Sequence, residues 1–215
     1  MYQPPHFRMA EEPALLAFIE QNPLGLLISS GSAGLMANPV PFFLRRGDQG
    51  LTLVAHLAKA NPQWKALTDE AEILVVFSGT DHYVSPGWYA TKQETGKVVP
   101  TWNYQLVQVR GTARIHQEPE WLLAQVSQLT GQYEDHRDQP WAVTDAPAPF
   151  VAAQLKGIVG VEIAVTAIEG KLKASQNRNA ADQQGVLQGL RQEETAEAHA
   201  MAELMLRSGV GKAEG

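Results

Sequence analysis

The stretch that decides the fold lies at residues 98–115 and reads VVPTWNYQLVQVRGTARI. In its second half, apolar or small residues at 107, 109, 111 and 113 alternate with polar residues at 108, 110, 112 and 114. A period of two is typical of a strand with one buried face and one wet face. The stretch is the longest strand candidate in the chain and therefore predicts a sheet protein.

Shorter apolar runs predict further strands. Runs at 24–30, 35–44 and 51–56 are joined by turn-like segments rich in Gly, which is typical of an antiparallel meander. Pro39 and Pro41 do not both fit a central ladder, so the middle strand is predicted to be an edge or to carry a bulge. Further strands or extended segments are expected at 73–77, 83–89 and 158–168.

Helices are predicted where the apolar spacing lengthens. The expected ranges are 13–19, 60–68 and 118–131, with two more between 180 and 207 that break near Gly189, whereas 135–149 is expected to be a loop. Six or seven strands with peripheral helices indicate a mainly β, α+β fold, a small antiparallel barrel. We expect one domain over 1–208, with C-terminal helices from about 180 and a flexible tail at 209–215.

Composition narrows the function classes. Of 215 residues, 44% are hydrophobic, which is enough for a core, and the net charge of −6 argues against broad nucleic-acid binding. The absence of cysteine excludes disulfides, thiolate metal sites and cysteine nucleophiles. The six histidines lack metal-ligand spacing, so no metal site is expected. Without a signal-peptide pattern or an apolar run of about 20 residues, we expect a cytoplasmic protein that does not enter a membrane.

Common catalytic and nucleotide-binding motifs are missing from the sequence. It has no GxxxxGK loop, no GxGxxG fingerprint and no GxSxG elbow. No residue pair indicates nucleophilic or acid–base catalysis, so the catalytic residues, and whether the protein is an enzyme, stay open.

The segment HLAKANPQWK at 56–65 runs from a strand end into a helix start. Free backbone N–H groups and the positive end of the helix dipole meet there, near Lys59 and Lys65, and this arrangement suits a phosphate. The alternative is a helix cap with two solvated lysines.

Three other segments combine aromatic, amide and cationic side chains. Residues 83–92 and 98–104 hold five of the ten Trp and Tyr residues, interleaved with Ser, Thr, Asn and Lys, as in pockets that stack a planar ligand. The alternative is an aromatic core beneath a loop. Residues 171–178 carry three cations that suit an anion or ring carbonyls. The alternative there is a polar loop in which Asn177 or Asn179 caps the next helix.

Five segments in one order resemble the PaiB-type family of FMN-binding negative transcriptional regulators. They are MYxPxHF at 1–7, HLAKANPQW at 56–64, YVSPxWY at 83–89, GKVVPTWNY at 96–104 and KASQNR at 173–178. The resemblance extends from residue 1 to about 190. It implies an FMN-binding split antiparallel β-barrel similar to pyridoxamine-phosphate oxidase, with homodimers that hold FMN at the subunit interface.

The resemblance also implies the cofactor-binding residues. Segment 56–65 would hold the FMN phosphate, and the edge strand at Asn38 and Pro39 would run along the isoalloxazine. Trp102 and its neighbours would line the ring, and the segment after residue 172 would close the site from the partner subunit. The implied set is Asn38, Pro39, His56, Leu57, Ala58, Lys59, Asn61, Trp64, Ser85, Trp88, Thr101, Trp102, Asn103, Lys173, Ser175, Gln176 and Asn177.

Two functions remain open at this stage. The first is negative regulation of transcription. The second is an FMN-dependent oxidoreductase acting on a small planar or haem-like substrate, in which the flavin does the redox chemistry. Direct DNA reading is not expected, because residues 178–215 hold four basic and six acidic side chains, a net charge of 4 − 6 = −2.

Overall fold

The computed structural model describes residues 1–32, 34–47, 50–67 and 72–211. The chain divides into two compact units: Met1–Leu15, Ser78–Val107 and Glu169–Gly215 form the first, and Leu16–Phe77 and Gln108–Ile168 form the second. The single domain over 1–208 stays a prediction. Most of the predicted tail at 209–215, from residue 212 onward, lies outside the described residues.

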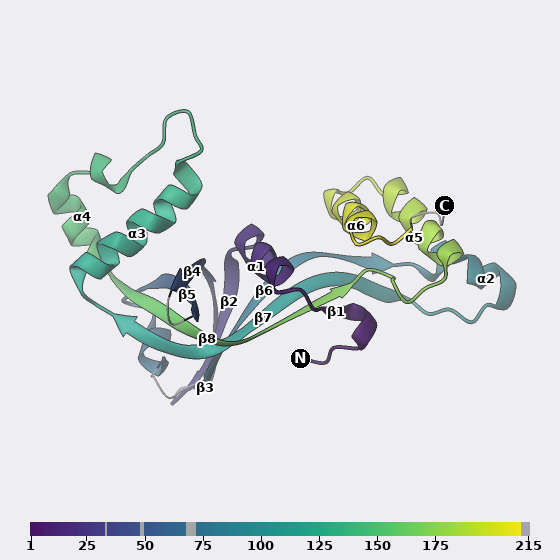
Figure 1. The fold of residues 1–215 in the computed structure, drawn as a ribbon, viewed down its shortest axis with the longest axis horizontal. Coiled ribbons are helices and arrows are strands. Elements are labelled where there is room, and N and C mark those ends of the chain that lie inside the picture. Colours follow the sequence, from purple (N-terminus) through teal and green to yellow (C-terminus); the bar gives the residue numbers. More distant parts are fainter. Residues whose placement is uncertain (33, 48–49, 68–71, 212–215) are drawn as a thin grey trace. The chain divides into compact units, whose positions relative to one another are not determined.

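The sheet is antiparallel in every pairing whose register is defined. Its order is β3-β2-β6-β7-β8-β5-β4, so among the described residues the ladder has two ends and does not close (Figure 1). The predicted α+β class with an antiparallel sheet is confirmed. The strands are β1 (Arg8–Met9), β2 (Leu24–Gly31), β3 (Gly34–Pro41), β4 (Phe43–Gly47), β5 (Gly50–Ala58), β6 (Glu72–Val84), β7 (Thr101–His116) and β8 (Ile158–Lys173).

The long strands β6, β7 and β8 contribute residues to both units. In β7 the predicted alternation is confirmed, because residues 107, 109, 111 and 113 are buried. Gly111 is required where β7 meets β8, since a Cβ there would lie 2.2 Å from the carbonyl oxygen of Ala164. The strand expected at 73–77 is confirmed as part of β6, which runs unbroken to Val84. The extended segment expected at 83–89 is wrong beyond Val84, because Pro86–Trp88 forms a 3-10 turn.

The predicted meander over 24–56 is wrong. β2 pairs with β3 and β4 pairs with β5, whereas β3 and β4 lie at opposite ends of the sheet order. The predicted strand at 35–44 divides at Phe42, whose backbone N–H donates to the carbonyl oxygen of Pro23 at 2.8 Å. Pro41 has no N–H for a ladder, which favours the break at this point. The edge position predicted for the Pro39 strand is confirmed.

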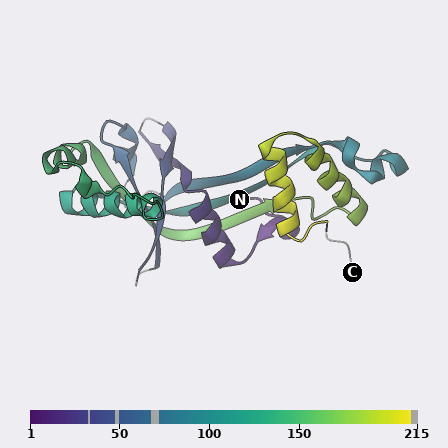
Figure 2. The ribbon, with the colours of Figure 1, turned by 90° about the horizontal axis from the view of Figure 1, so that it is seen from above.

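Helices of the second unit pack beside one end of the sheet. The helix α3 (Pro119–Glu134) confirms the helix expected at 118–131, and it lies beside α4 (Ala148–Leu155) (Figures 1 and 2). Neither α4 nor the 3-10 turn η4 (Val143–Asp145) was expected: η4 lies inside the predicted loop, and α4 begins at the end of that loop and continues to Leu155. The helix expected at 60–68 is only the five-residue 3-10 helix η2 (Pro62–Ala66). The predicted first helix is confirmed as α1 (Glu12–Gln21), which spans the boundary between the units.

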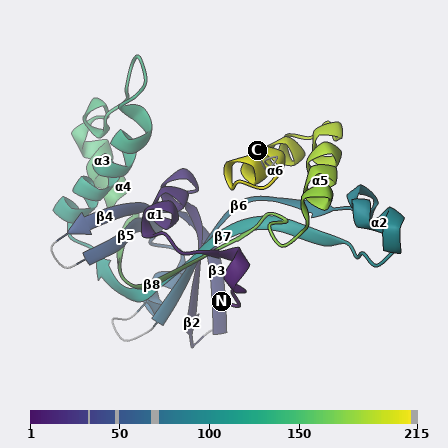
Figure 3. The same cartoon turned by 45° about the vertical axis from the view of Figure 1, so that its right-hand side comes forward.

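The first unit has its own apolar core beneath two C-terminal helices. The helices α5 (Ala180–Gln192) and α6 (Ala196–Arg207) pack on each other (Figure 3), and their buried residues include Val186, Leu190, Met201 and Met205. The remaining elements are η1 (Pro5–Phe7), η3 (Pro86–Trp88) and α2 (Ala90–Thr95).

The break between these helices lies at residues 193–195, and the predicted break near Gly189 is wrong. Gly189 lies inside α5 because the ring of Trp88 packs against it: a Cβ there would lie 2.3 Å from Cδ2 of Trp88. The glycine therefore serves a close contact and does not end the helix. No helix among the described residues is long and apolar enough to cross a membrane.

Candidate functional site

The predicted site residues fall into two groups, one in each unit. Residues 38–64 belong to the second unit and residues 85–177 of the set belong to the first. Each group has its own geometry, and each contains a cavity with a predicted residue in its wall.

The predicted phosphate segment offers fewer free N–H groups than expected. Asn61 caps η2, and its Oδ1 accepts a hydrogen bond from the backbone N–H of Gln63 at 3.0 Å. Pro62 has no N–H, and a five-residue 3-10 helix carries only a small dipole. The helix start expected here is therefore a short 3-10 turn with one of its N–H groups already capped, and the phosphate site itself stays a prediction.

Gln63, which sequence reasoning missed, anchors this segment on β2 and β3. It is fully buried. Its Nε2 donates to the carbonyl oxygen of Leu27 at 2.9 Å and to Oγ of Ser29 at 3.2 Å, and its Oε1 accepts from Nδ2 of Asn38 at 2.8 Å. Asn38, which was predicted to run along the flavin ring, therefore uses its side-chain N–H to hold Gln63. Pro39 beside it is exposed on the edge strand.

Lys59 lines a cavity of about 250 Å³ that also contains Lys156 and Gln117. Neither lysine forms an ion pair with the described residues. Two uncompensated ammonium groups at one cavity suit a phosphate. Lys156 was missed because it is almost one hundred residues away in sequence, and no local pattern connects it to Lys59.

The other residues of segment 56–65 make contacts within the segment or pack in the core. Nε1 of Trp64 donates to the carbonyl oxygen of Lys59 at 3.0 Å, and Nζ of Lys65 lies 5.8 Å from the centre of the Trp64 ring. Leu57 is buried in the core, and Ala58 is the last residue of β5. Lys65 therefore faces an aromatic ring, in contrast to Lys59.

His56 lines a different cavity from Lys59. Its Nδ1 lies 2.9 Å from Oε1 of Gln125 on α3, and its cavity of about 260 Å³ is also lined by Trp141 and Phe150. Burial lowers the pKa of His56, and the hydrogen bond to Gln125 offsets this only in part. A neutral imidazole in an apolar wall is a poor ligand for a phosphate.

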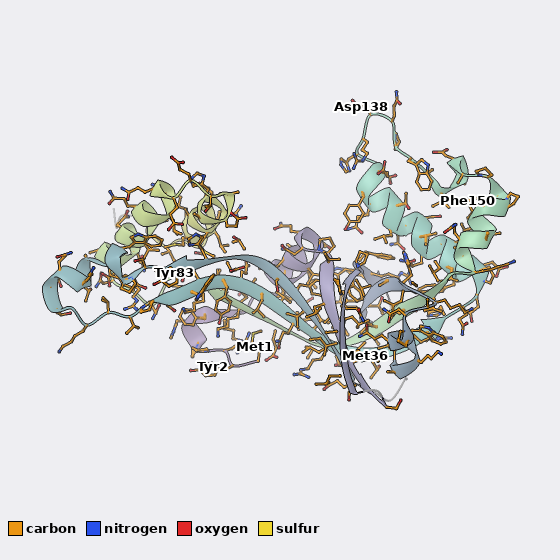
Figure 4. The ribbon with its side chains drawn as sticks, turned by 180° about the vertical axis from the view of Figure 1, so that it is seen from behind. Met1, Tyr2, Met36, Tyr83, Asp138 and Phe150 are labelled. Carbon is orange, nitrogen blue, oxygen red and sulfur yellow. The ribbon has the colours of Figure 1, made fainter. Side chains whose placement is uncertain are left out.

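In the first unit, Trp102 lies on an open aromatic surface. Its side chain is 53% exposed and meets the ring of Tyr83 edge-on, with the ring centres 6.1 Å apart. Trp102 also lines a cavity of about 380 Å³ with Asp81 and Tyr104. Figure 4 labels Tyr83 on this part of the molecule. An exposed indole beside a cavity is available for stacking on a planar ligand.

A cluster of cations accompanies this aromatic surface. Nζ of Lys173 donates to the hydroxyl of Thr101 and to the carbonyl oxygen of Trp102. Burial lowers the pKa of Lys173, and the positive charges of Lys171 and Arg178 lower it further. Lys171 is only 8% exposed, and its Nζ lies 5.4 Å from the ring centres of both Tyr2 and Tyr104. No carboxylate among the described residues forms an ion pair with either lysine, so this cluster favours an anionic or electron-rich ligand.

Other predicted residues of the first unit hold the loop after β8 in shape. Nδ2 of Asn103 donates to Oγ of Ser175 at 3.0 Å, and both side chains are buried. Ser175 has a φ of 63°, which is unusual for a residue other than glycine. Gln176 accepts from the N–H of Ala174 and donates to the carbonyl oxygen of Leu172, both at 2.6 Å.

Asn177 is exposed, and the cap of α5 is Asn179, whose Oδ1 accepts from the N–H of Asp182 at 2.8 Å. Ser85 caps η3 by accepting from the N–H of Gly87 at 3.1 Å, and Trp88 packs against α5. In segment 83–92 the alternative interpretation, an aromatic core beneath a loop, therefore describes Trp88 and Tyr89, both of which belong to the core of this unit or pack against it.

The chain matches the family model described as "Putative FMN-binding domain" over residues 1–167. The chain belongs to this FMN-binding family. It is 33% identical over 205 residues to a Bacillus subtilis (strain 168) protein named "Protease synthase and sporulation protein PAI 2", with 95% of this chain and 96% of that protein covered. An uncharacterized Aspergillus fumigatus protein is 34% identical over 223 residues, covering 82% of this chain and 85% of its own length. The PaiB-type resemblance is confirmed.

Solved structures of similar fold include the flavocytochrome Anf3 from Azotobacter vinelandii, at a TM-score of 0.56 and 15% identity, with 78% of this chain and 69% of that chain covered. Another is the FAD and heme binding protein from Mycobacterium smegmatis, at a TM-score of 0.55 and 17% identity, with coverages of 77% and 73%. At these identities the likeness concerns the fold alone. The predicted split-barrel fold is confirmed, and the sheet of the described residues does not close.

Proposed function

We propose that this member of the FMN-binding family binds FMN as a homodimer and acts as a negative regulator of transcription. The observation that carries the proposal is the cavity that Lys59 and Lys156 both line, neither of them in an ion pair with the described residues. A terminal phosphate is the part of FMN that needs such a site, and paired lysines are common ligands for phosphate oxygens.

The first unit supplies the groups that suit the flavin ring. Trp102 offers an exposed aromatic face, and Lys173 offers a cation held by Thr101 and the backbone. We place these contacts on the partner protomer, because exposed Trp102 and Tyr83 form an apolar surface that a second copy would cover. When bound, the flavin supplies one- and two-electron redox chemistry, and the protein orients it and tunes its environment.

The regulatory role does not require direct DNA reading by the C-terminal helices. Met201 and Met205 of α6 are buried in the core of the first unit, and the helix has no basic stripe. A recognition helix needs a free basic face for the major groove. We therefore propose that repression depends on a partner of the flavin-loaded protein.

The phosphate site is tested by titrating the flavin-free protein with FMN and with riboflavin, which lacks the phosphate, while flavin fluorescence is followed. In wild type we expect FMN to bind at least tenfold more tightly than riboflavin. Lys59→Ala combined with Lys156→Ala should remove that preference, because both phosphate cations are lost. Lys65→Ala, which removes the lysine over Trp64, is the matched control and should keep the preference. Equal binding of the two flavins to wild type would contradict the assignment.

The dimer and the regulatory role need their own measurements. Light scattering during size-exclusion chromatography should give twice the mass of 23.5 kDa, and Trp102→Glu should shift the protein toward the monomer. Gel shifts with the promoter of its own gene at physiological salt should show no specific complex for the protein alone. A specific shift at nanomolar protein would overturn the indirect mechanism.

An FMN-dependent oxidoreductase is the second candidate. The cavity of about 380 Å³ beside Trp102 favours it, because that cavity has room for a planar substrate near Asp81 and Tyr104. The test is anaerobic addition of NADH or NADPH to the flavin-loaded protein. Rapid bleaching of the flavin absorbance, followed by turnover with an electron acceptor, would establish the enzyme, and a stable oxidised spectrum would favour the regulator.

A further inference from the structure

The second unit holds a cavity that the proposed phosphate contacts do not use. It has a volume of about 260 Å³ and is lined by residues of β5, β8, α3, α4 and the segment between these helices. The described residues that line it include no Lys, Arg, Asp or Glu. An uncharged wall of this kind favours an uncharged ligand, because a buried charge would have no partner there.

His56 gives this apolar cavity a hydrogen-bond acceptor. The atom 2.9 Å from its Nδ1 is the side-chain amide oxygen Oε1 of Gln125, which only accepts, so Nδ1 carries the proton and Nε2 carries a lone pair. Among the described residues no group forms a hydrogen bond to Nε2 of His56, whose side chain lines the cavity. Burial lowers the pKa of this histidine, which keeps the acceptor free of protons at neutral pH.

The side-chain amide of Gln125 is a second unsatisfied group next to His56, although Gln125 itself is not in the cavity lining. Gln125 is fully buried, and within the described part of the chain its Nε2 has no hydrogen-bond partner. Buried polar groups of a folded protein are nearly always paired. This Nε2 belongs to the same side-chain amide whose Oε1 bonds His56, so the His56–Gln125 pair has one N–H donor that is not used.

The size and rim of the cavity indicate an aromatic guest. Cavities of about 150 Å³ lined by Leu, Ile and Phe hold benzene, so 260 Å³ leaves room for two fused rings. Trp141 and Phe150 line the cavity and remain 48% and 55% exposed. Figure 4 labels Phe150 on α4. A bound ring would cover apolar surface that is otherwise left in water.

We propose that this cavity binds a small uncharged aromatic molecule of one or two rings, which donates one hydrogen bond from an N–H or O–H group to Nε2 of His56. The site is separate from the phosphate cavity of Lys59, although both contain Leu155 and Ile158 in their walls. The proposal does not depend on FMN binding.

Calorimetric titration of the full-length protein with indole and with 1-methylindole tests the hydrogen bond without any mutation. The two probes have nearly the same shape, but only indole has an N–H to donate. We expect 1-methylindole to bind about tenfold more weakly, the effect of one lost hydrogen bond. Equal affinities, or no binding of indole, would overturn the proposal.

A matched pair of substitutions tests the place of binding. Ala146→Phe adds a ring at the cavity wall and should weaken indole binding at least tenfold. Ala153→Phe makes the same change at an exposed position of α4 that is outside the lining, and it should leave indole affinity within twofold. Unchanged indole binding in a folded Ala146→Phe protein would overturn the assignment.

Repeating the titration with saturating FMN separates this proposal from the proposed function. We expect indole to bind with the same affinity in the presence of FMN. Displacement of indole by FMN would show that the cavity is part of the flavin site and would overturn the inference. A protein that binds indole but not FMN would overturn the proposed function and leave this inference standing.

Discussion

The segments 56–64 and 171–178 have similar compositions but use their polar side chains differently. In the second unit, His56 and Lys59 face separate cavities, one neutral and one cationic. In the first unit, Lys171, Lys173 and Arg178 are close enough for their charges to interact, and Asn103 and Ser175 brace the loop beneath them. The comparison shows that one polar motif combines residues that line a cavity with residues that hold the backbone in shape.

The largest effect is expected from Gln63→Leu, which breaks the anchor of segment 56–64. The substitution leaves Asn38 and two acceptors on β2 without their buried partner, and each unsatisfied group costs about 1–3 kcal/mol. We expect the free energy of unfolding in urea to fall by about 3 kcal/mol. Gln21→Leu, at an exposed helix end, is the control and should stay within about 0.5 kcal/mol. A loss below 1 kcal/mol for Gln63→Leu would refute the anchor.

The next effect concerns the corresponding brace in the first unit. Asn103→Leu keeps the number and branching of side-chain heavy atoms but removes the buried bond to Ser175, which is expected to cost about 2 kcal/mol. Asn177→Leu, in the same loop but exposed, should leave stability unchanged. If both changes were equally costly in urea unfolding, the division between bracing and exposed residues would be wrong.

A pH-dependent effect distinguishes His56 from other histidines. Its pKa is lowered by burial in the folded protein, so the unfolded chain binds more protons below the ordinary value of 6.5. The free energy of unfolding should therefore fall as pH drops below about 6.5, with a slope of at most about 1.4 kcal/mol per pH unit from this group. His56→Gln should flatten that part of the profile, whereas His136→Gln, in an exposed loop, should not. Identical profiles for wild type and His56→Gln would exclude this role.

The smallest effect is expected from Lys173 at alkaline pH. Its pKa is also lowered, first by burial and then by neighbouring cations, so the unfolded chain binds more protons just below the ordinary value of 10.5. Stability should rise as pH increases toward 10.5, by well under 1 kcal/mol because water screens this half-buried group. Lys173→Met should remove the rise, and Lys92→Met, on the exposed side of α2, serves as the control. A rise that persists in Lys173→Met would have another origin.

The sequence was sufficient to predict those elements whose pattern is contained within a few neighbouring residues. The alternation in β7, the helix α3 and the edge position of Pro39 are all predicted, because each depends on side-chain period or on the missing proline N–H. Gly189 was misread as a helix break because its contact with Trp88 comes from about one hundred residues away. Lys156 and Gln125 were missed for the same reason: their partners, Lys59 and His56, are distant in sequence.

By itself the sequence determined the α+β class, the antiparallel strands and the family, since periodicity and ordered motifs are properties of the linear chain. Only the tertiary structure decided which polar residues face a cavity and which serve as braces. Hydrogen-bond partners, burial and uncompensated charge arise from contacts between distant segments. That is why His56 and Lys59, three positions apart, line two different cavities, of which the Lys59 cavity contains two lysines and the His56 cavity is mostly apolar.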